Sequence, residues 1–187
     1  ELKDKLKQAM AELVVGDAQQ QTTDVAAVIC QDAKDAVNHY LNSEFIQPKI
    51  IYQTKIPSEL AEQLHEHNFV PPSLVEIEEI TQVQQEIFAP VLHICPYQES
   101  HKVLKQMQTM GYGLTMAVHT RNQHLWQQIA LDAQVGNIYI NRNQVGAVVG
   151  CQAFGGMNLS GTGPKAGGPN YLAAFLNEKL ICENTAA

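Results

Sequence analysis

A long glycine-rich segment places the strongest constraint on how this chain folds. Nine of the 12 glycines lie between Gly136 and Pro169, in the sequence GNIYINRNQVGAVVGCQAFGGMNLSGTGPKAGGP. Apolar residues such as Val145, Val148 and Phe154 are interleaved with the glycines, and the segment has almost no helical periodicity. Because glycine allows positive φ angles and close backbone approach, a loop this long inside a domain is usually functional. We expect backbone amides beside an apolar wall, which suits a small ligand with a carboxylate and an aliphatic stem.

Two nucleotide-binding motifs fit parts of this segment loosely, and both fail on context. Residues 161–166 match the G-x-G-x-x-A dinucleotide pattern, but Pro164 interrupts it and no strand immediately precedes it. Residues 156–161 have the spacing of a phosphate-binding loop, yet Thr162 follows where that loop has its lysine. The sequence therefore predicts no phosphate cradle in this segment.

Length, composition and charge limit the class of protein. At 187 residues, 45% hydrophobic and 17% charged, the chain is long enough for one domain with its own core, and nothing demands two. No apolar run approaches the ~20 residues of a membrane span. A net charge of −7 argues against a nucleic-acid-binding surface, for which a basic face is expected.

The side chains that could bind a metal or attack a substrate form no recognisable site. The four cysteines are widely spaced and include no C-x-x-C pair, which favours free thiols in a reducing cytoplasm. Cys151 is the only one in a loop. His65 and His67 are neighbours, and His93 shares a strand face with Cys95, but such pairs lack a third and fourth ligand. We expect no metal site and no catalytic residue among these side chains.

The hydrophobic pattern predicts alternating helices and strands. We expect helices at residues 2–14, 33–41, 100–110 and 125–133. We expect strands at residues 49–54, 73–77, 91–95, 114–120 and 137–141, an extended run at 25–30 and a turn or short helix at 57–65. Gly16 and Gly111 stand where C-terminal helix caps belong, and Asn122 can cap the last helix. This alternation predicts an α/β fold, an open twisted sheet with flanking helices and crossover connections.

The glycine-rich segment resembles the C-terminal signature of the aldehyde dehydrogenase superfamily almost residue for residue. The similarity lies in NRNQVGAVVG, AFGG, SGTGPKAGGP and Tyr171, and it extends over essentially the whole chain. Within the superfamily the chain is most similar to the L-glutamate γ-semialdehyde (1-pyrroline-5-carboxylate) dehydrogenase module of bacterial proline utilization A. The resemblance implies that residues 1–187 are the C-terminal portion of a single aldehyde dehydrogenase domain.

The catalytic cysteine of this family lies in a Gly-Gln-Arg-Cys type motif, upstream of the segment that residues 1–17 resemble. Residues 1–187 contain no such motif. The resemblance therefore implies a fragment without its nucleophile, which we expect to be inactive as an isolated polypeptide.

A second motif, QEIFAP, resembles the Glu-Ile-Phe-Gly-Pro sequence of the family. The resemblance implies that Glu86 accepts hydrogen bonds from the nicotinamide-ribose hydroxyls of NAD and that Phe88 packs near the nicotinamide. From the hexapeptide alone, a solvated glutamate at a strand end is the simpler interpretation. Ala89 replaces the usual glycine, and a positive φ at this position would cost about 1 kcal/mol.

By the same resemblance, Gly146 and Ala147 occupy the loop whose main-chain amides bind the α-carboxylate of the aldehyde. Phe154 occupies the aromatic position that packs on the aliphatic stem of the substrate. Many family members have serine where this chain has Ala147, so one side-chain hydroxyl bond is missing while the backbone donors remain. Core packing is the alternative for Phe154. Lys165 is expected to be a surface charge or to brace the loop.

The resemblance implies a parent enzyme that oxidises L-glutamate γ-semialdehyde to L-glutamate with NAD in proline catabolism. Two alternatives stay open at this point. One is an aldehyde dehydrogenase for another aldehyde, and the other is a non-catalytic module that retains the fold. The expected partners are a small aldehyde and the rest of the parent polypeptide, with a homo-oligomer left open.

Overall fold

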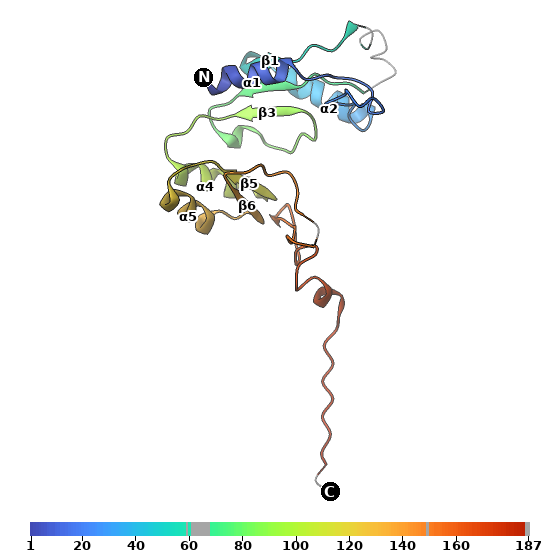
Figure 1. Ribbon diagram of the computed structural model, residues 1–187, viewed down its shortest axis with the longest axis vertical. Helices are drawn as coiled ribbons and strands as arrows, with labels where there is room; N and C mark the ends of the chain where they lie inside the picture. Colours follow the sequence, from blue (N-terminus) through green and yellow to red (C-terminus); the bar gives the residue numbers. More distant parts are fainter. Residues whose placement is uncertain (59, 61–67, 149, 186–187) are drawn as a thin grey trace. The chain divides into compact units, whose positions relative to one another are not determined.

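The chain divides into two units, each with helices, strands and a core of its own. The computed structural model describes residues 1–58, 60, 68–148 and 150–185. The first unit is Glu1–Gln98 and the second is Glu99–Ala187 (Figure 1). Helices and strands alternate in both, which confirms the α/β class. In the described part of the chain the strands are distributed over three small sheets.

The first unit is built around a three-stranded sheet. Its elements are α1 (Leu2–Ala11), α2 (Gln31–Leu41), the 3-10 helix η1 (Gln47–Lys49), β1 (Ile50–Gln53), β2 (Ser73–Glu76), the 3-10 helix η2 (Ile80–Gln82) and β3 (Val91–Ile94). β2 is the central strand, antiparallel to β1 and parallel to β3. The crossover that joins the parallel pair spans residues 77–90, and η2 is its only helical element. This crossover carries the first of the predicted site motifs.

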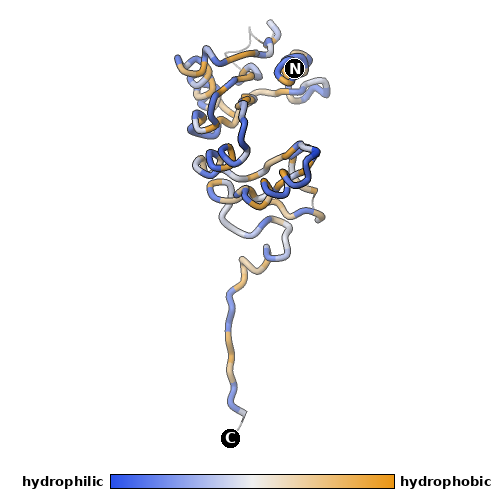
Figure 2. The backbone as a smooth tube through the Cα atoms, turned by 90° about the vertical axis from the view of Figure 1, so that its left-hand side faces the viewer, coloured by the Kyte–Doolittle hydropathy of each residue, from blue (hydrophilic) through white to orange (hydrophobic). Residues whose placement is uncertain are grey.

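The core of the first unit forms where helix α2 packs on the sheet. Val37 and Leu41 are four residues apart and therefore share one face of α2. They pack with buried residues of the sheet and its connections; the cluster is Val37, Leu41, Ile46, Val70, Val75 and Ile77. Apolar and polar residues accordingly alternate along the helices (Figure 2).

Two predictions for the first unit were wrong. Helix α1 ends at Ala11, not at residue 14, and its C-cap is Glu12 in a right-handed helical conformation. Gly16 has no positive φ and caps nothing. Its N–H donates instead to the Val25 carbonyl at 3.0 Å, and a Cβ there would lie 2.8 Å from Oγ1 of Thr23. The run at residues 25–30 belongs to no named strand, and its first residue, Val25, forms a single bridge to Val15. The prediction for residues 57–65 lies mostly outside the described residues.

The second unit contains two short sheets. Its elements are α4 (Ser100–Met110), β4 (Tyr112–Gly113), β5 (Thr115–Val118), α5 (Gln123–Asp132), β6 (Asn137–Ile140), β7 (Met157–Asn158) and the 3-10 helix η3 (Leu172–Phe175). β5 and β6 are parallel and joined through α5, whereas β4 and β7 are antiparallel. Leu104, Val118 and Ile129 form the core between the helices and the parallel pair.

Both predicted helix caps of this unit are confirmed. Gly111 ends α4 with a φ of 77°. The Oδ1 atom of Asn122 accepts a hydrogen bond from the Leu125 amide at 3.1 Å and so begins α5.

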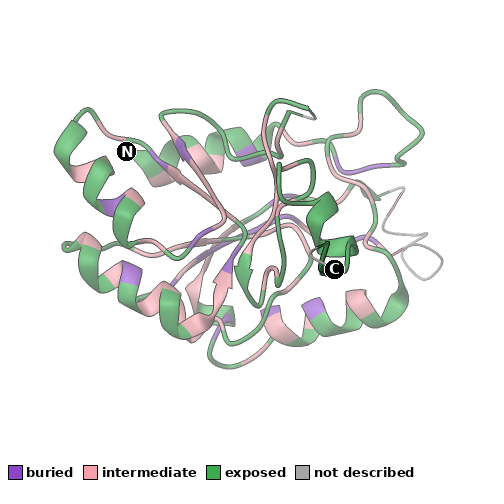
Figure 3. Ribbon diagram, turned by 90° about the horizontal axis from the view of Figure 1, so that it is seen from below, coloured by how far each residue is buried: buried purple, intermediate pink, exposed green. Residues whose placement is uncertain are grey.

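Strand β6 has two different faces, which determines what it can hold. Ile138 and Ile140 pack against the core of the second unit. Because side chains alternate along a strand, Asn137 and Tyr139 lie on the opposite face. Residues 171–185 beyond the glycine-rich segment are exposed throughout (Figure 3, green). Within the ranges that the structure describes, no helix has the length and hydrophobicity to cross a membrane.

Candidate functional site

The predicted site residues fall in two places, one in each unit. Glu86 and Phe88 lie in the β2–β3 crossover of the first unit, and Gly146, Ala147 and Phe154 lie in the glycine-rich loop of the second. Each place is described by itself.

The crossover presents Glu86 and Phe88 outward by burying the residues that alternate with them. Ile87 and Ala89 pack against the core of the first unit. Glu86 is exposed, and the Phe88 ring is 82% exposed. Within the described ranges the Glu86 carboxylate has no hydrogen-bond or ion-pair partner. The crossover therefore offers an unpaired anionic acceptor next to an uncovered aromatic ring.

The unusual backbone of this motif falls at Phe88. Phe88 has a φ of 49°, whereas Ala89 is not among the residues with positive φ. The absence of glycine at position 89 therefore causes no strain there, and the left-handed conformation of Phe88 costs roughly 1–2 kcal/mol. Hydrogen bonds to the two residues that follow Phe88 hold the chain after this turn. Ala89 O accepts from the Val91 amide at 2.7 Å, and Pro90 O accepts from the Ser73 amide at 2.9 Å.

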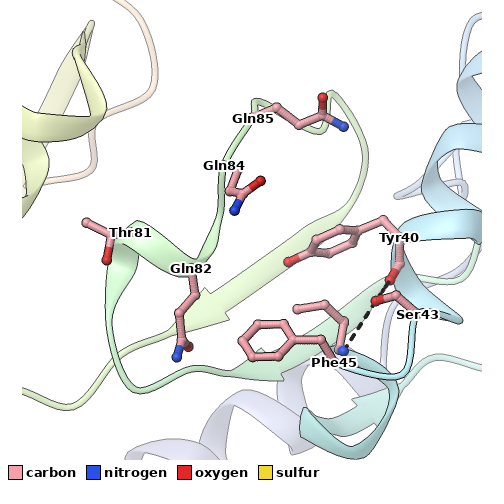
Figure 4. A pocket seen from close by; sticks show the side chains of 8 residues that line it. Tyr40, Ser43, Phe45, Thr81, Gln82, Gln84 and Gln85 are labelled. Atoms are coloured by element: carbon pink, nitrogen blue, oxygen red, sulfur yellow. Dashed lines mark hydrogen bonds between the residues drawn. The ribbon is translucent and has the colours of Figure 1, made fainter.

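A hollow of about 800 Å³ lies beside the first half of the crossover (Figure 4). It is lined by Tyr40, Ser43, Phe45, Ile46, Thr81, Gln82, Gln84 and Gln85. The rings of Tyr40 and Phe45 enter from the side of α2, and the Gln82 and Gln84 side chains enter from the crossover (Figure 4). The sequence did not predict this hollow, because its two walls are about 40 residues apart in the chain and only Gln85, the first residue of the QEIFAP motif, belongs to a recognisable pattern.

His93 is used structurally. Its Nε2 atom lies 2.7 Å from the Tyr40 hydroxyl, and the two rings meet edge to face with centroids 5.9 Å apart. Burial lowers the pKa of His93 and raises the pKa of Tyr40, so both side chains are neutral at pH 7. Cys95, which was considered as its metal-binding neighbour, donates its thiol to the Glu78 carbonyl at 3.2 Å. His65 lies outside the described residues.

Metal-ligating side chains do not gather elsewhere in the described ranges. No group of three or more His, Cys, Asp or Glu side chains there could hold a metal ion. All four cysteines are free, and Cys151 is exposed on the loop. The negative charges next to β2 are partly paired, since Glu76 at the end of this strand forms an ion pair with Lys3.

The loop at Gly146 and Ala147 presents two consecutive backbone donors. In the part of the chain that the structure describes, neither amide has a hydrogen-bond acceptor. Gly146 has a φ of 60°, and a Cβ added to it would meet nothing within 4 Å. Its carbonyl accepts a hydrogen bond from the Tyr139 hydroxyl at 2.8 Å. The two amides are thus open to solvent on a backbone that is fixed from behind.

The backbone around Phe154 is fully paired, which fixes its side chain. Phe154 N–H donates to Ala166 O at 3.0 Å, and Ala166 N–H donates to Phe154 O at 2.9 Å. The Asn137 side chain donates to Ala153 O at 3.0 Å and accepts from Gly155 N–H at 3.3 Å. The ring is half-buried and is not among the side chains packed on the core of the second unit.

Lys165 braces the loop, which is one of the two roles that the sequence predicts for it. Its ammonium group donates to the Gly136 carbonyl and, at 3.3 Å, to Oδ1 of Asn137. Gly136 must be glycine here, because a Cβ would lie 1.8 Å from Gly155 O. Gly136 therefore allows the loop to lie directly against the start of β6.

Strand β6 holds both parts of the predicted anchor, and the sequence analysis missed this role. Tyr139 contacts the Gly146 carbonyl, and Asn137 bridges the peptide groups on either side of Phe154. The available signal was the polar–apolar alternation NIYI in the strand that precedes the loop. That alternation predicts a polar face opposite the core face but does not say what the face binds.

Comparisons with known proteins bear on the whole chain. The aldehyde dehydrogenase family model matches residues 1–181. The bifunctional protein PutA of Klebsiella aerogenes is 42% identical over 177 residues, which cover 93% of this chain and 14% of that protein. The 1-pyrroline-5-carboxylate dehydrogenase of Bacillus cereus (strain B4264) is 41% identical over 117 residues, which cover 62% of this chain and 23% of that protein.

Solved structures give the same relationship. Proline utilization A from Bradyrhizobium japonicum matches with a TM-score of 0.81 and 39% identity, over 92% of this chain and 17% of that chain. A 1-pyrroline-5-carboxylate dehydrogenase from Thermus with bound NAD matches with a TM-score of 0.77 and 30% identity, over 94% of this chain and 33% of that chain. The chain therefore spans a small part of each relative's length.

Proposed function

Because the chain belongs to the aldehyde dehydrogenase family, we propose that it is the C-terminal portion of the catalytic domain of an NAD-dependent L-glutamate γ-semialdehyde dehydrogenase acting in proline catabolism. The observation that carries this proposal is the pair of unpartnered amides at Gly146 and Ala147, with Phe154 held by the same strand. The names of the relatives support the substrate, since they include PutA and 1-pyrroline-5-carboxylate dehydrogenase.

The proposed anchor matches the substrate in both charge and shape. The two amides are donors for the α-carboxylate, and hydrogen bonds to an ionised acceptor are stronger than neutral ones. The half-buried Phe154 ring offers an apolar surface for the aliphatic stem. Ala147 contributes no hydroxyl, so the backbone supplies the donors at these two positions. An aldehyde without an α-carboxylate would leave both amides unpaired, which is costly.

The crossover of the first unit fits the cofactor. The exposed Glu86 carboxylate is a suitable acceptor for a pair of ribose hydroxyls, and the uncovered Phe88 ring is a surface on which a planar ring can lie. NAD, when bound, supplies the hydride acceptor. Glu86 and Phe88 orient it, and Ile87 and Ala89 keep the crossover in place by packing on the core.

The nucleophile is expected to come from another part of the parent polypeptide. Aldehyde oxidation in this family needs a cysteine thiolate, and no Gly-Gln-Arg-Cys motif occurs in residues 1–187. We therefore propose that the two units belong to one catalytic domain and that residues 1–187 alone do not oxidise the aldehyde. The four free thiols support a reducing cytoplasm as the compartment.

Product inhibition tests the proposal. L-Glutamate carries the same α-carboxylate and stem as the open aldehyde, so it should inhibit the intact parent competitively against the aldehyde. Pentanamide, which has the chain length but no carboxylate to place in the anchor in either orientation, is the matched control and should inhibit much more weakly. Equal inhibition by the two compounds would remove the anchor and with it the substrate assignment, and would favour a dehydrogenase for another aldehyde.

A further inference from the structure

We propose that Tyr139 is a positioning residue for substrate recognition: its hydroxyl aims the Ala147 amide at the α-carboxylate of the aldehyde. This inference rests on the proposed function, because it assigns a role within the same anchor. It concerns a residue that touches neither the substrate nor the cofactor and that acts through the loop backbone.

The geometry of the peptide group gives the first argument. The carbonyl of Gly146 and the N–H of Ala147 belong to one planar trans peptide, in which they point in opposite directions. The Tyr139 hydroxyl holds the Gly146 carbonyl toward β6 at 2.8 Å. The Ala147 N–H must therefore point away from the strand, to the side on which it has no partner in the described part of the chain.

The freedom of the loop gives the second argument. Gly146 has a φ of 60° and open space around the position of a Cβ, so its own packing does not hold it. The nearest hydrogen bond on its N-terminal side is a weak one, from the Val145 amide to Oδ1 of Asn143 at 3.4 Å. In contrast, Tyr139 is only 6% exposed and sits on β6, whose other face packs on the core. The hydroxyl thus transfers the rigidity of the strand to an otherwise loosely held glycine.

The charge near Tyr139 gives the third argument. The Arg142 guanidinium carbon lies 4.9 Å from the centroid of the Tyr139 ring. A cation over a phenol ring attracts the electron density of the ring, and this makes the phenol O–H a stronger hydrogen-bond donor. The same positive charge lies over the ring whose hydroxyl contacts the Gly146 carbonyl, and a positive charge favours an anion over a neutral ligand nearby.

The test is Tyr139→Phe in the intact parent enzyme, because phenylalanine keeps the buried ring and its contact with Arg142 and removes only the hydroxyl. We expect the KM for glutamate semialdehyde to rise about ten-fold, the loss that one misaligned charge-assisted hydrogen bond produces. The inhibition constant of L-glutamate should rise by the same factor. The kcat, the KM for NAD and the KM for pentanal should change by less than about two-fold.

Tyr112→Phe is the matched control. Tyr112 lies on β4 of the same unit, is half-buried, and its hydroxyl has no partner in the ranges that the structure describes. Loss of this hydroxyl should leave all five constants unchanged.

Three outcomes separate the possibilities. The inference is supported if the wild-type enzyme prefers glutamate semialdehyde to pentanal and Tyr139→Phe reduces that preference about ten-fold. If the wild-type enzyme shows this preference and Tyr139→Phe leaves it intact, the inference alone is overturned. The inference is also overturned if Tyr139→Phe weakens the use of both aldehydes equally, because an equal loss indicates general destabilisation. A wild-type enzyme without the preference refutes the proposed function itself.

Discussion

The Tyr40 hydroxyl and Nε2 of His93 lie 2.7 Å apart and tie helix α2 to strand β3 of the first unit. The rings also meet edge to face, so the pair combines a hydrogen bond with aromatic packing. Either neutral tautomer of His93 can complete this hydrogen bond, because a phenol both donates and accepts. Tyr40 also lines the hollow beside the cofactor motif.

A pH dependence of stability follows from the lowered pKa of His93. Burial disfavours its charged form in the folded state, whereas the unfolded chain titrates near the ordinary value of about 6.5. The unfolded state therefore binds more protons below that pH, so the contribution of neutral His93 is fully present above about pH 6.5 and is lost as the pH falls below it. Urea unfolding of the 187-residue chain from pH 8 to pH 5 should show this loss.

His93→Gln should flatten this profile, since glutamine can still bond to Tyr40 and does not titrate. His124→Gln, at an exposed position of α5, is the control and should leave the slope unchanged. A profile that stays equally steep in His93→Gln would show that another group causes the dependence.

Glu86→Gln in the intact parent should weaken NAD use. An amide still accepts a hydroxyl bond but lacks the negative charge, a difference of about 1–2 kcal/mol, so the KM for NAD should rise about ten-fold while aldehyde binding stays nearly unchanged. Steady-state kinetics with each substrate varied in turn measures both. Glu78→Gln, an exposed glutamate of the same crossover, should have no effect. An unchanged KM for NAD together with an unchanged rate would exclude Glu86 from the site.

Gly146→Val should raise the KM for glutamate semialdehyde ten-fold or more. The φ of 60° at this position disfavours a β-branched residue, so valine should force the backbone into another conformation. That conformation turns the amides away from the carboxylate, and their charge-assisted hydrogen bonds are worth roughly 1.5–3 kcal/mol each. Gly150→Val is the control, since Gly150 has a φ of 80° and equally open space in the same loop. Both variants should lose similar stability in thermal unfolding, but only the first should lose substrate affinity. Equal kinetic losses would mean that general loop strain explains the effect.

Phe154→Ala should change selectivity by stem length. The backbone around the ring makes two hydrogen bonds with Ala166 and two with the Asn137 side chain, so the ring can provide apolar contact without being part of the core of the second unit. Each buried methylene is worth about 0.8 kcal/mol, so the KM of long aldehydes should rise several-fold and that of acetaldehyde least. A series of straight-chain aldehydes measures this trend. Phe175→Ala, an exposed aromatic beyond the loop, should leave the series unchanged; a uniform loss in Phe154→Ala would indicate core packing instead.

Local patterns predicted most of the regular structure. The helix caps at Gly111 and Asn122 and all five expected strands could be predicted because propensity, periodicity and capping chemistry agreed there. Gly16 was misinterpreted because a glycine shortly after a helix can also serve close packing, here against Thr23, and sequence does not distinguish the two uses.

The supporting contacts of the site could not be predicted in the same way. Tyr139 and Gly146 are seven residues apart, but their contact depends on how the loop folds back onto β6. The Tyr40–His93 pair and the hollow that Tyr40 lines depend on contacts between residues about 40 to 50 positions apart. The strain that a positive φ would cause at Ala89 does not arise, because the positive φ lies one residue earlier, at Phe88.

Substrate preference of the intact parent tests the central claim most directly. The measurement is kcat/KM with NAD for glutamate semialdehyde and for pentanal, which has the same chain length and no α-carboxylate. If the free amides of Gly146 and Ala147 bind that carboxylate, glutamate semialdehyde should be preferred by at least about a hundred-fold, because pentanal displaces water from these donors and gives them no acceptor in return. Equal kcat/KM values for the two aldehydes would contradict the account.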